Sequence, residues 1–302
     1  MTLTRLDTPV KEPSVRPIAA GRRLRNGVSI VLCGGAFVLS MVPLVWVLHT
    51  VVSRGFPAVT SLNWWTRSMN GVLPEELSGG VAHAIYGTLV QVAIASFMAV
   101  PLGVFVAIYL VEYGRGWPAR ATSFMVDILS GVPSIVAALF VFSLWIATLG
   151  LPRSGFAVSL ALVLLMIPMV ARSAEEMLKR VPDEVREAAY ALGITKGTTI
   201  ARIVVPSALP GMISGILIAL ARVMGETAPV LVLIGYTSAI NFDALEGNMA
   251  SLPLLIYSEW SNPVAEGQHR VWGAALTLII LVAAIYLAAA LVSRYLVRNR
   301  TR

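Results

Sequence analysis

The sequence predicts an all-α, polytopic membrane protein with about six transmembrane helices. Its composition is 57% hydrophobic and only 13% charged, whereas a soluble domain is nearer a quarter charged. The apolar residues also gather in runs long enough to cross a bilayer, which takes about 20 residues of helix. In lipid every backbone N–H needs a partner, and runs of this length satisfy their own groups only as helices.

Six apolar runs meet the length requirement. They occupy residues 27–52, 83–111, 121–149, 155–173, 207–236 and 272–296. The first run is longer than the ~7–15 apolar residues of a cleaved secretion signal, and a polar segment precedes it. We therefore expect a cytoplasmic tail over residues 1–26, a transmembrane domain over 27–296 and a short cytoplasmic tail over 297–302.

The distribution of Lys and Arg predicts the orientation of the chain. Eighteen of the 23 lie in the N-terminal tail, in the loops after the second and fourth runs, or at the C-terminus, and four lie in the other loops. Basic residues accumulate on the cytoplasmic side of membrane proteins. Both termini and the loop after the fourth run are therefore expected in the cytoplasm.

The net charge of +7 fits either nucleic acid or anionic lipid as a partner. The basic residues are not clustered with aromatic residues in a soluble domain, which disfavours nucleic acid and leaves the lipid bilayer. The single cysteine, Cys33, lies inside an apolar run and excludes an intrachain disulfide or a cysteine metal cluster. No pattern indicates a metal site or a catalytic residue.

The two long outside loops carry aromatic residues, Trp64 and Trp65 in the first and Tyr257 and Trp260 in the second. Such side chains concentrate where the membrane meets water, so we expect an interfacial belt. The alternative is a docking surface for a partner outside the membrane.

The cytoplasmic loop 174–206 contains the sequence REAAYALGITKGTTIARIVVP. Pro182 followed by Asp183 is typical of a helix start, and Gly193 of a helix end. Between them, apolar residues recur at helical spacing: Val185, Ala188, Ala189 and Leu192. The loop is therefore predicted as a helix, a tight turn and a second short helix, with Pro206 opening the next span. Its alanine-lined face fits either a partner protein or the inner leaflet.

The same segment resembles the EAA motif of bacterial ABC importer permeases, which reads EAA-x3-G-x9-I-x-L-P. The one departure is Val205 in place of Leu. The resemblance implies that this helix docks on a cytoplasmic ATPase subunit and moves when that subunit closes on ATP. It assigns ATPase coupling to Glu187, Ala188, Ala189, Leu192, Gly193, Ile203 and Pro206. In this assignment Glu187 is the polar anchor, the alanines form the close contact and Gly193 makes the turn.

The chain carries no nucleotide-binding signature of its own. Its three lysines, Lys11, Lys179 and Lys196, stand outside any G-x-x-x-x-G-K-[ST] pattern. ATP and Mg²⁺ are therefore expected on a partner chain. This chain is expected to be a transport subunit without a cofactor rather than an enzyme.

The fifth apolar run contains two charged residues near its middle, Arg222 and Glu226. Each costs about 2.5–3.5 kcal/mol on insertion scales, so such residues rarely face lipid. At 100° per residue they share a stripe with Gly211 and Gly215, whose spacing permits close helix contact. The pair either locks helix packing as an i,i+4 ion pair or serves as a relay for an anion, which a guanidinium binds through forked donors.

The third run is expected to bend at Pro133, which removes a helix hydrogen bond. Ser130 and Ser134 beside it belong either to a packing kink or to a flexible wall of the translocation pathway. Asp127, early in the same run, is expected to hydrogen-bond a neighbouring helix, with contact to a transported substrate as the alternative.

Three stretches, DILSGVPSIV, ARVMGETAPVL and LPLLIYSEWSNP, resemble phosphate-specific ABC transporter permeases of the PstA type. The resemblance implies the type I ABC importer permease fold, a place in the bacterial cytoplasmic (inner) membrane and import of inorganic phosphate. It also implies three partners: a second related permease (PstC type), an ATPase subunit dimer (PstB type) and an external phosphate-binding protein (PstS type). The intramembrane Arg–Glu pair of that family matches Arg222 and Glu226.

Two other functions stay open. A permease for another oxyanion, such as phosphonate, molybdate or sulfate, would share this architecture and differ in a transport assay. An ion-coupled secondary carrier would need no ATPase, and it would leave the EAA spacing as a coincidence.

Overall fold

The computed structural model describes residues 20–76 and 78–298, and within these ranges the chain is helical without a strand. Five helices are long and apolar enough to cross a membrane, or six if one sharply bent pair counts as a single span. The predicted all-α polytopic fold class is confirmed. The chain divides into two compact units, residues 1–50 and 51–302.

α1 (Ala20–Val59) begins in the first unit and contains the first predicted span. Residues 20–26, assigned to the cytoplasmic tail, are helical and continue directly into that span, whereas residues 1–19 lie outside the described part of the chain. No residue in the most apolar window of this helix is buried. A helix that is apolar on all sides needs lipid or protein around it.

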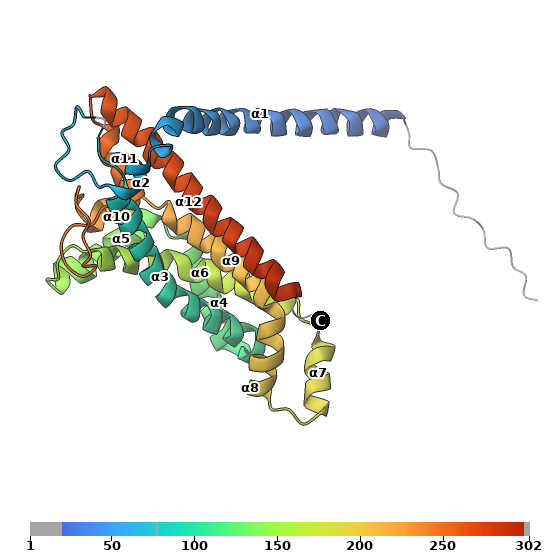
Figure 1. Cartoon of the computed structure of the whole chain (residues 1–302). Helices are drawn as coiled ribbons and strands as arrows, with labels where there is room; N and C mark the ends of the chain where they lie inside the picture. The colour runs from blue at the N-terminus through green and yellow to red at the C-terminus, as the bar shows by residue number, and fades with distance from the viewer. Residues whose placement is uncertain (1–19, 77, 299–302) are drawn as a thin grey trace, which may run out of the picture. The chain divides into compact units, whose positions relative to one another are not determined.

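α6 (Gly155–Lys179) is the central helix of the second unit and contacts α3 (Ala82–Ile108) and α9 (Val205–Met224) along its length. Small residues allow the close approach of α3, because a Cβ added at Gly103 would lie 2.8 Å from Val170 Cγ1. Figure 1 shows α6 enclosed by these neighbours. The buried core between the helices includes Ala95, Ala99, Ala157, Ala161, Met166 and Ala219.

The third predicted span is broken rather than continuous. α4 (Gly116–Gly131) ends before Pro133, and α5 (Ser134–Val141) with its π-helical extension η2 (Phe142–Thr148) leaves at an angle of 103°. The expected bend at Pro133 is therefore present, but it is a complete break. The cause is local, since the residue before a proline is driven into extended backbone and cannot continue a helix.

The fifth predicted span, 207–236, has different bounds in the structure. It starts earlier, because α8 (Lys196–Thr199) and the π-helical η3 (Ile200–Val204) run without a break into α9. It also ends earlier, at Met224, and a short α10 (Ala228–Leu233) follows after three non-helical residues. The prediction of one continuous helix over 207–236 is therefore wrong.

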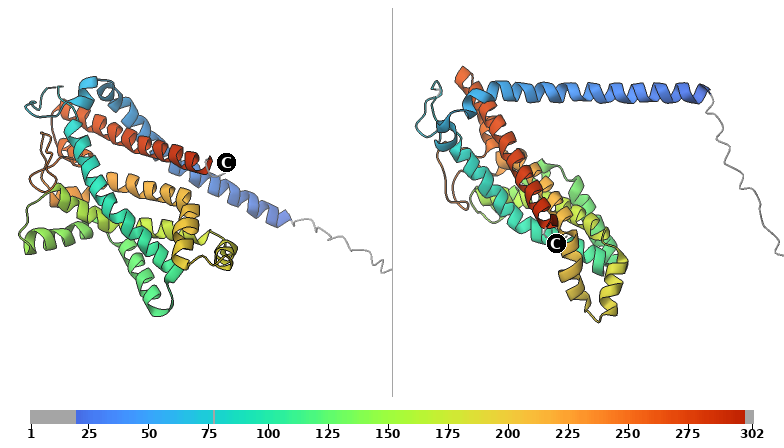
Figure 2. Two further views of the ribbon diagram at one scale, coloured as in Figure 1. Left: turned by 60° about the horizontal axis from the view of Figure 1, so that its bottom comes forward. Right: turned by 45° about the vertical axis from the view of Figure 1, so that its right-hand side comes forward.

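The two ends of the second unit carry different elements. α7 (Asp183–Ala191) and α8 project together as a helical hairpin from one end, which Figures 1 and 2 show from several sides. The opposite end carries two short helices, α2 (Leu62–Thr66) and α11 (Leu252–Trp260). The last helix, α12 (Ala265–Arg298), connects the α2–α11 end to the C-terminus, and residues 299–302 lie outside the described chain.

One aromatic residue of the α2–α11 end contradicts the predicted interfacial belt. Trp64 is only 7% exposed, and its Nε1 donates to Thr277 Oγ1 at 2.9 Å. Its indole N–H is satisfied inside the protein, so it does not need the membrane surface. Tyr257 and Trp260 are exposed, as such a belt requires.

Candidate functional site

The α7–α8 hairpin has the geometry predicted for the cytoplasmic loop. Pro182 precedes the first turn of α7, and Asp183 lies in that turn, where a negative charge is favourable. At the other end Gly193 has φ +75°, its N–H donates to Tyr190 O, and Ile194 N donates to Ala189 O. This pair of bonds around a left-handed residue is a Schellman motif, which ends a helix and satisfies its last carbonyls.

The residues assigned to coupling differ in exposure. Glu187, Ala188 and Leu192 are exposed on the hairpin, and Leu192 reaches 81% exposure, so this surface is open to a partner. Ala189 is only 3% exposed and faces back into the protein. Of the two alanines only Ala188 is open to a partner in this conformation, and the assignment of Ala189 to the contact surface stays a prediction. Ile203 and Pro206 are half-buried where the second arm joins α9.

Glu112, which was not among the predicted site residues, is bonded to both arms of this hairpin near its base. Glu112 lies in η1 (Tyr109–Tyr113), the π-helical extension of α3, and its side chain is 5% exposed. It forms an ion pair with Arg186 of α7 at 2.8 Å, and its backbone carbonyl accepts a hydrogen bond from Lys196 of α8. An acidic residue at the end of an apolar run was the only sequence signal for it.

Arg222 and Glu226 do not form the i,i+4 ion pair that was one of the two alternatives for these residues. α9 ends at Met224, so Glu226 lies in the non-helical link to α10, while Arg222 occupies the last turn of α9. Within residues 20–76 and 78–298, no ion pair joins the two. Arg222 is exposed and Glu226 is half-buried.

Glu226 lines a small cavity of about 10 Å³, which is close to the space needed for one water site. Thr88, Gln91 and Ser251 line the same cavity. Gln91 is 2% exposed, and its Nε2 has no hydrogen-bond partner in the described part of the chain. Glu226 thus shares this cavity with polar residues of α3 and the start of α11, whereas Arg222 is exposed.

The predicted glycine stripe does provide a close helix contact. A Cβ at Gly211 would lie 2.2 Å from Met177 Sδ, and one at Gly215 would lie 1.5 Å from Ser173 Oγ, so both glycines abut α6. The stripe therefore sets the distance between α9 and α6.

The remaining predicted pathway residues lie around the bend between α4 and α5. Asp127 accepts from Arg172 Nε at 3.1 Å, which is the interhelical bond from α4 to α6 that we expected. Ser130 donates to Val126 O within its own helix, and Ser134 opens α5. In the described residues no hydrogen bond or ion pair connects these three side chains with Arg222 or Glu226.

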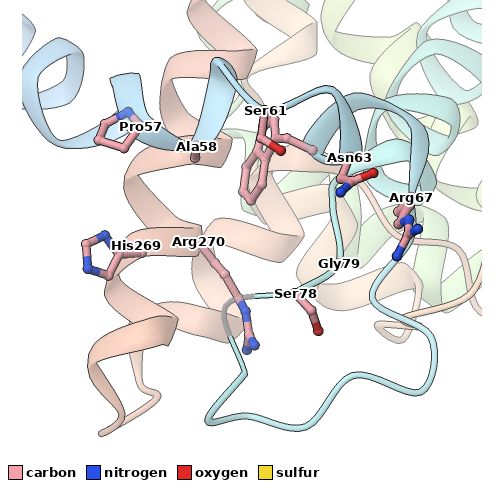
Figure 3. A pocket seen from close by; sticks show the side chains of 10 residues that line it. Pro57, Ala58, Ser61, Asn63, Arg67, Ser78, Gly79, His269 and Arg270 are labelled. Atoms are coloured by element: carbon pink, nitrogen blue, oxygen red, sulfur yellow. The ribbon is translucent and has the colours of Figure 1, made fainter.

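A pocket of about 340 Å³ lies at the α2–α11 end. Figure 3 shows Arg270 of α12 pointing toward the loop that carries Ser78, while His269 points away from that loop. Arg270 is 6% exposed and fully engaged, since it pairs with Glu259 and donates to two carbonyl groups of the loop. It therefore fixes the loop rather than offering a free charge to a ligand. No group of three His, Cys, Asp or Glu side chains in the described chain is arranged to hold a metal ion.

Comparison with known proteins identifies the family. Residues 99–302 match the family described as "Binding-protein-dependent transport system inner membrane component". The chain belongs to this family. The matched residues include the α7–α8 hairpin, Arg222, Glu226 and the bend at Pro133, so the candidate sites of the permease lie within the part of the chain that matches the family.

Curated relatives cover nearly the whole permease. It is 63% identical over 287 residues to the phosphate transport system permease protein PstA of Mycobacterium leprae (strain TN), a match covering 95% of this chain and 94% of that protein. It is 60% identical over 302 residues to PstA 1 of Mycobacterium tuberculosis (strain ATCC 25618 / H37Rv), covering 100% and 98%. The PstA protein of Yersinia pestis is 38% identical over 273 residues, with 89% and 90% covered.

Solved structures show the fold of the permease. A chain of the MetNI methionine ABC transporter in an inward-facing conformation matches with a TM-score of 0.61 at 20% identity, covering 72% of this chain and 95% of that one. A chain of a bacterial ABC transporter involved in alginate import matches with a TM-score of 0.62 at 15% identity, covering 90% and 99%. The chain thus has the fold of ABC importer permeases.

Proposed function

We propose that this chain is the permease subunit of an ATP-driven importer of inorganic phosphate. It forms half of the translocation pathway and couples to a separate ATPase subunit. The observation that carries the proposal is the identity of 60% over 302 residues to a phosphate transport system permease. The fold supports the transport role, and the relatives' printed function supports the choice of phosphate.

The α7–α8 hairpin is the proposed docking site of the ATPase. It projects from the bundle, and Glu187, Ala188 and Leu192 are exposed on it. Exposed small and apolar residues beside one carboxylate fit a groove on another protein. In this proposal the partner is an ATPase dimer of the PstB type, which holds the ATP and Mg²⁺, so this chain needs no cofactor.

Arg222 and Glu226 are the proposed polar residues of the pathway. Arg222 is exposed at the end of α9, and the forked donors of its guanidinium match phosphate oxygens. The break between α9 and α10 supports this role, since non-helical backbone at membrane depth occurs where it is buried in protein or lines a water-filled cavity. A second permease of the PstC type supplies the facing half.

The proposed cycle starts outside, where a phosphate-binding protein of the PstS type delivers its ligand to the external loops. ATP-driven closure of the partner then displaces α7 and changes the opening of the bundle. Arg222 provides one transient binding step, because conduction requires that an ion both enter and leave. In this arrangement the chain lies in the bacterial inner membrane, with both termini and the α7–α8 hairpin on its cytoplasmic side.

The test is transport by the full complex, reconstituted in liposomes with its two permeases, ATPase and binding protein. We expect uptake of radiolabelled inorganic phosphate that needs ATP and the ATPase subunit. Uptake of sulfate, molybdate or a phosphonate with indifference to phosphate would replace the proposed substrate. Uptake that continues without the ATPase subunit would indicate a secondary carrier instead.

A further inference from the structure

Glu112 contacts both arms of the α7–α8 hairpin. Its carboxylate oxygen Oε1 accepts from Arg186 Nη2 at 2.8 Å and from Arg186 Nε at 3.1 Å. Its backbone carbonyl accepts from Lys196 Nζ, which belongs to the other arm. One residue at the end of α3–η1 is therefore bonded to the chain on both sides of the Gly193 turn.

Arg186 extends this attachment to α6. Its Nη1 donates to Val181 O at 2.6 Å, and its Nη2 donates to Leu178 O at 3.1 Å. The last carbonyls of a helix have no partner within the helix, so this guanidinium caps the C-terminal end of α6. The side chain is only 12% exposed, and its charge is balanced by Glu112 and Asp183. α6, α7 and η1 thus meet at one buried guanidinium.

Lys196 adds a weaker contact on the open side. Its Nζ lies 4.5 Å from the centroid of the Tyr113 ring, within the range of a cation–π interaction. Lys196 itself is exposed, so this contact is screened by solvent and contributes less than the buried pair.

The tip of the hairpin is free by comparison. A Cβ placed on Gly193 would meet nothing within 4 Å, and Leu192 beside it is 81% exposed. A force applied to this tip reaches the bundle through the backbone at the two ends of the hairpin, where α8 and η3 run on into α9, and through the side-chain attachments at its base. With those attachments intact, a displacement of α7 must move the ends of α3 and α6. Without them, the non-helical residues 180–182 between α6 and α7 can absorb the displacement.

We propose that Glu112 is a positioning residue for energy coupling, which holds both arms of the α7–α8 hairpin so that a displacement of α7 is passed to α3 and α6. The inference rests on the proposed function, because it assumes a partner ATPase that moves α7. In this proposal Glu112 affects the amount of phosphate transported per ATP hydrolysed, and it does not bind phosphate or ATP.

The experiment measures two quantities in the complete reconstituted complex: uptake of radiolabelled inorganic phosphate and formation of ADP. Glu112→Gln keeps the size of the side chain and the backbone carbonyl but removes the negative charge. We expect ADP formation to continue and phosphate uptake per ADP to fall at least about fivefold, the lower range of measured coupling effects. Glu112→Asp keeps the charge on a shorter side chain and is expected to recover part of this ratio.

Glu176→Gln is the matched control. It removes the carboxylate of another pair on the same end of the bundle, with Arg180 at 2.6 Å, but both of those side chains are about two-thirds exposed at 65% and 67%. Pairs of this kind contribute little, so uptake per ADP should match the wild type.

Lys196→Met is the second variant, in case Glu112→Gln does not assemble. Its side chain is exposed, so we expect an assembled complex with a reduced ratio of uptake to ADP. A wild-type ratio in assembled Glu112→Gln would overturn the inference, as would a wild-type ratio in Lys196→Met where Glu112→Gln does not assemble. If the wild-type complex transports a different oxyanion, the proposed substrate is wrong, and the ratio is then measured with that anion.

Discussion

Arg222 and Glu226 lie four residues apart and have different surroundings. Arg222 is exposed, whereas Glu226 lines a cavity with the buried amide of Gln91. The cavity, of about 10 Å³, is close to the space needed for one water site. An anion that reaches Arg222 in this conformation therefore meets a guanidinium whose carboxylate neighbour is not paired with it, which favours binding.

Replacing Arg222 with Gln tests the pathway role. We expect ATP-dependent phosphate uptake to fall at least about tenfold, since a charge-assisted hydrogen bond contributes about 1.5–3 kcal/mol. Uptake into liposomes is the measurement, and copurification with the partner subunits checks assembly. Arg120→Gln, an exposed arginine of α4, is the control that should transport normally. Normal uptake by an assembled Arg222→Gln complex would refute the relay.

Arg270 is a buried charged residue at the α2–α11 end of the second unit. It pairs with Glu259 at 3.3 Å and donates to Leu73 O and Glu76 O. Arg270→Gln leaves Glu259 without its counter-charge, and breaking a buried pair in this way costs about 3–5 kcal/mol. We expect a lower melting temperature and faster proteolysis within loop 67–80.

The control for Arg270 is Arg67→Gln, which changes an exposed arginine of the same pocket. That variant should keep both the melting temperature and the cleavage rate. If Arg270→Gln also leaves them unchanged, the loop is held by other contacts.

At the scale of elements, the helix breaks are set by two local signals of different strength. Pro133 breaks the third span because the residue before a proline avoids helical backbone. The break after Met224 has no proline at its start, and its one local signal is Gly225, which closes α9 in helical-region backbone. Glycine weakens a helix by only about 1 kcal/mol, so packing of α10 against α5 and α6 contributes to this break.

Gly193 is the element-scale test of the hairpin. Its φ of +75° costs an L-residue about 1–2 kcal/mol, so Gly193→Leu should shift the turn between the two arms. We expect ADP formation to continue while phosphate uptake per ADP falls severalfold. Gly197→Leu is the control, because its Cβ also meets nothing within 4 Å but its backbone is helical. Coupled transport in Gly193→Leu would count against docking through this hairpin.

At the scale of the whole molecule, apolar side chains are exposed over much of the helical surface. On α1 alone Leu39 is 73% exposed and Trp46 is 71% exposed. A surface of this kind is incompatible with water and requires lipid or a second apolar subunit. This agrees with the family's place in the membrane.

The orientation of the whole chain can be tested with single cysteines in a Cys33→Ala background. Asn70→Cys and Thr198→Cys place exposed thiols on loop 67–80 and on the α7–α8 hairpin. We expect a membrane-impermeant maleimide to label Asn70→Cys in intact cells and Thr198→Cys only after permeabilisation, as the distribution of basic residues indicates. The reverse pattern would invert the topology.

The sequence by itself determined the helical membrane class, the positions of most spans, the bend at Pro133 and the Gly193 turn. Each depends on neighbours along the chain: an apolar run, a missing N–H or a glycine that tolerates left-handed backbone. Only the tertiary structure decided the burial of Trp64, the separation of Arg222 from Glu226 and the attachment of the hairpin to Glu112. Two of these features are contacts between residues far apart in the sequence, Trp64 with Thr277 and Glu112 with Arg186, and no local pattern predicts such contacts. The third depends on where α9 ends, to which the packing of α10 against α5 and α6 contributes.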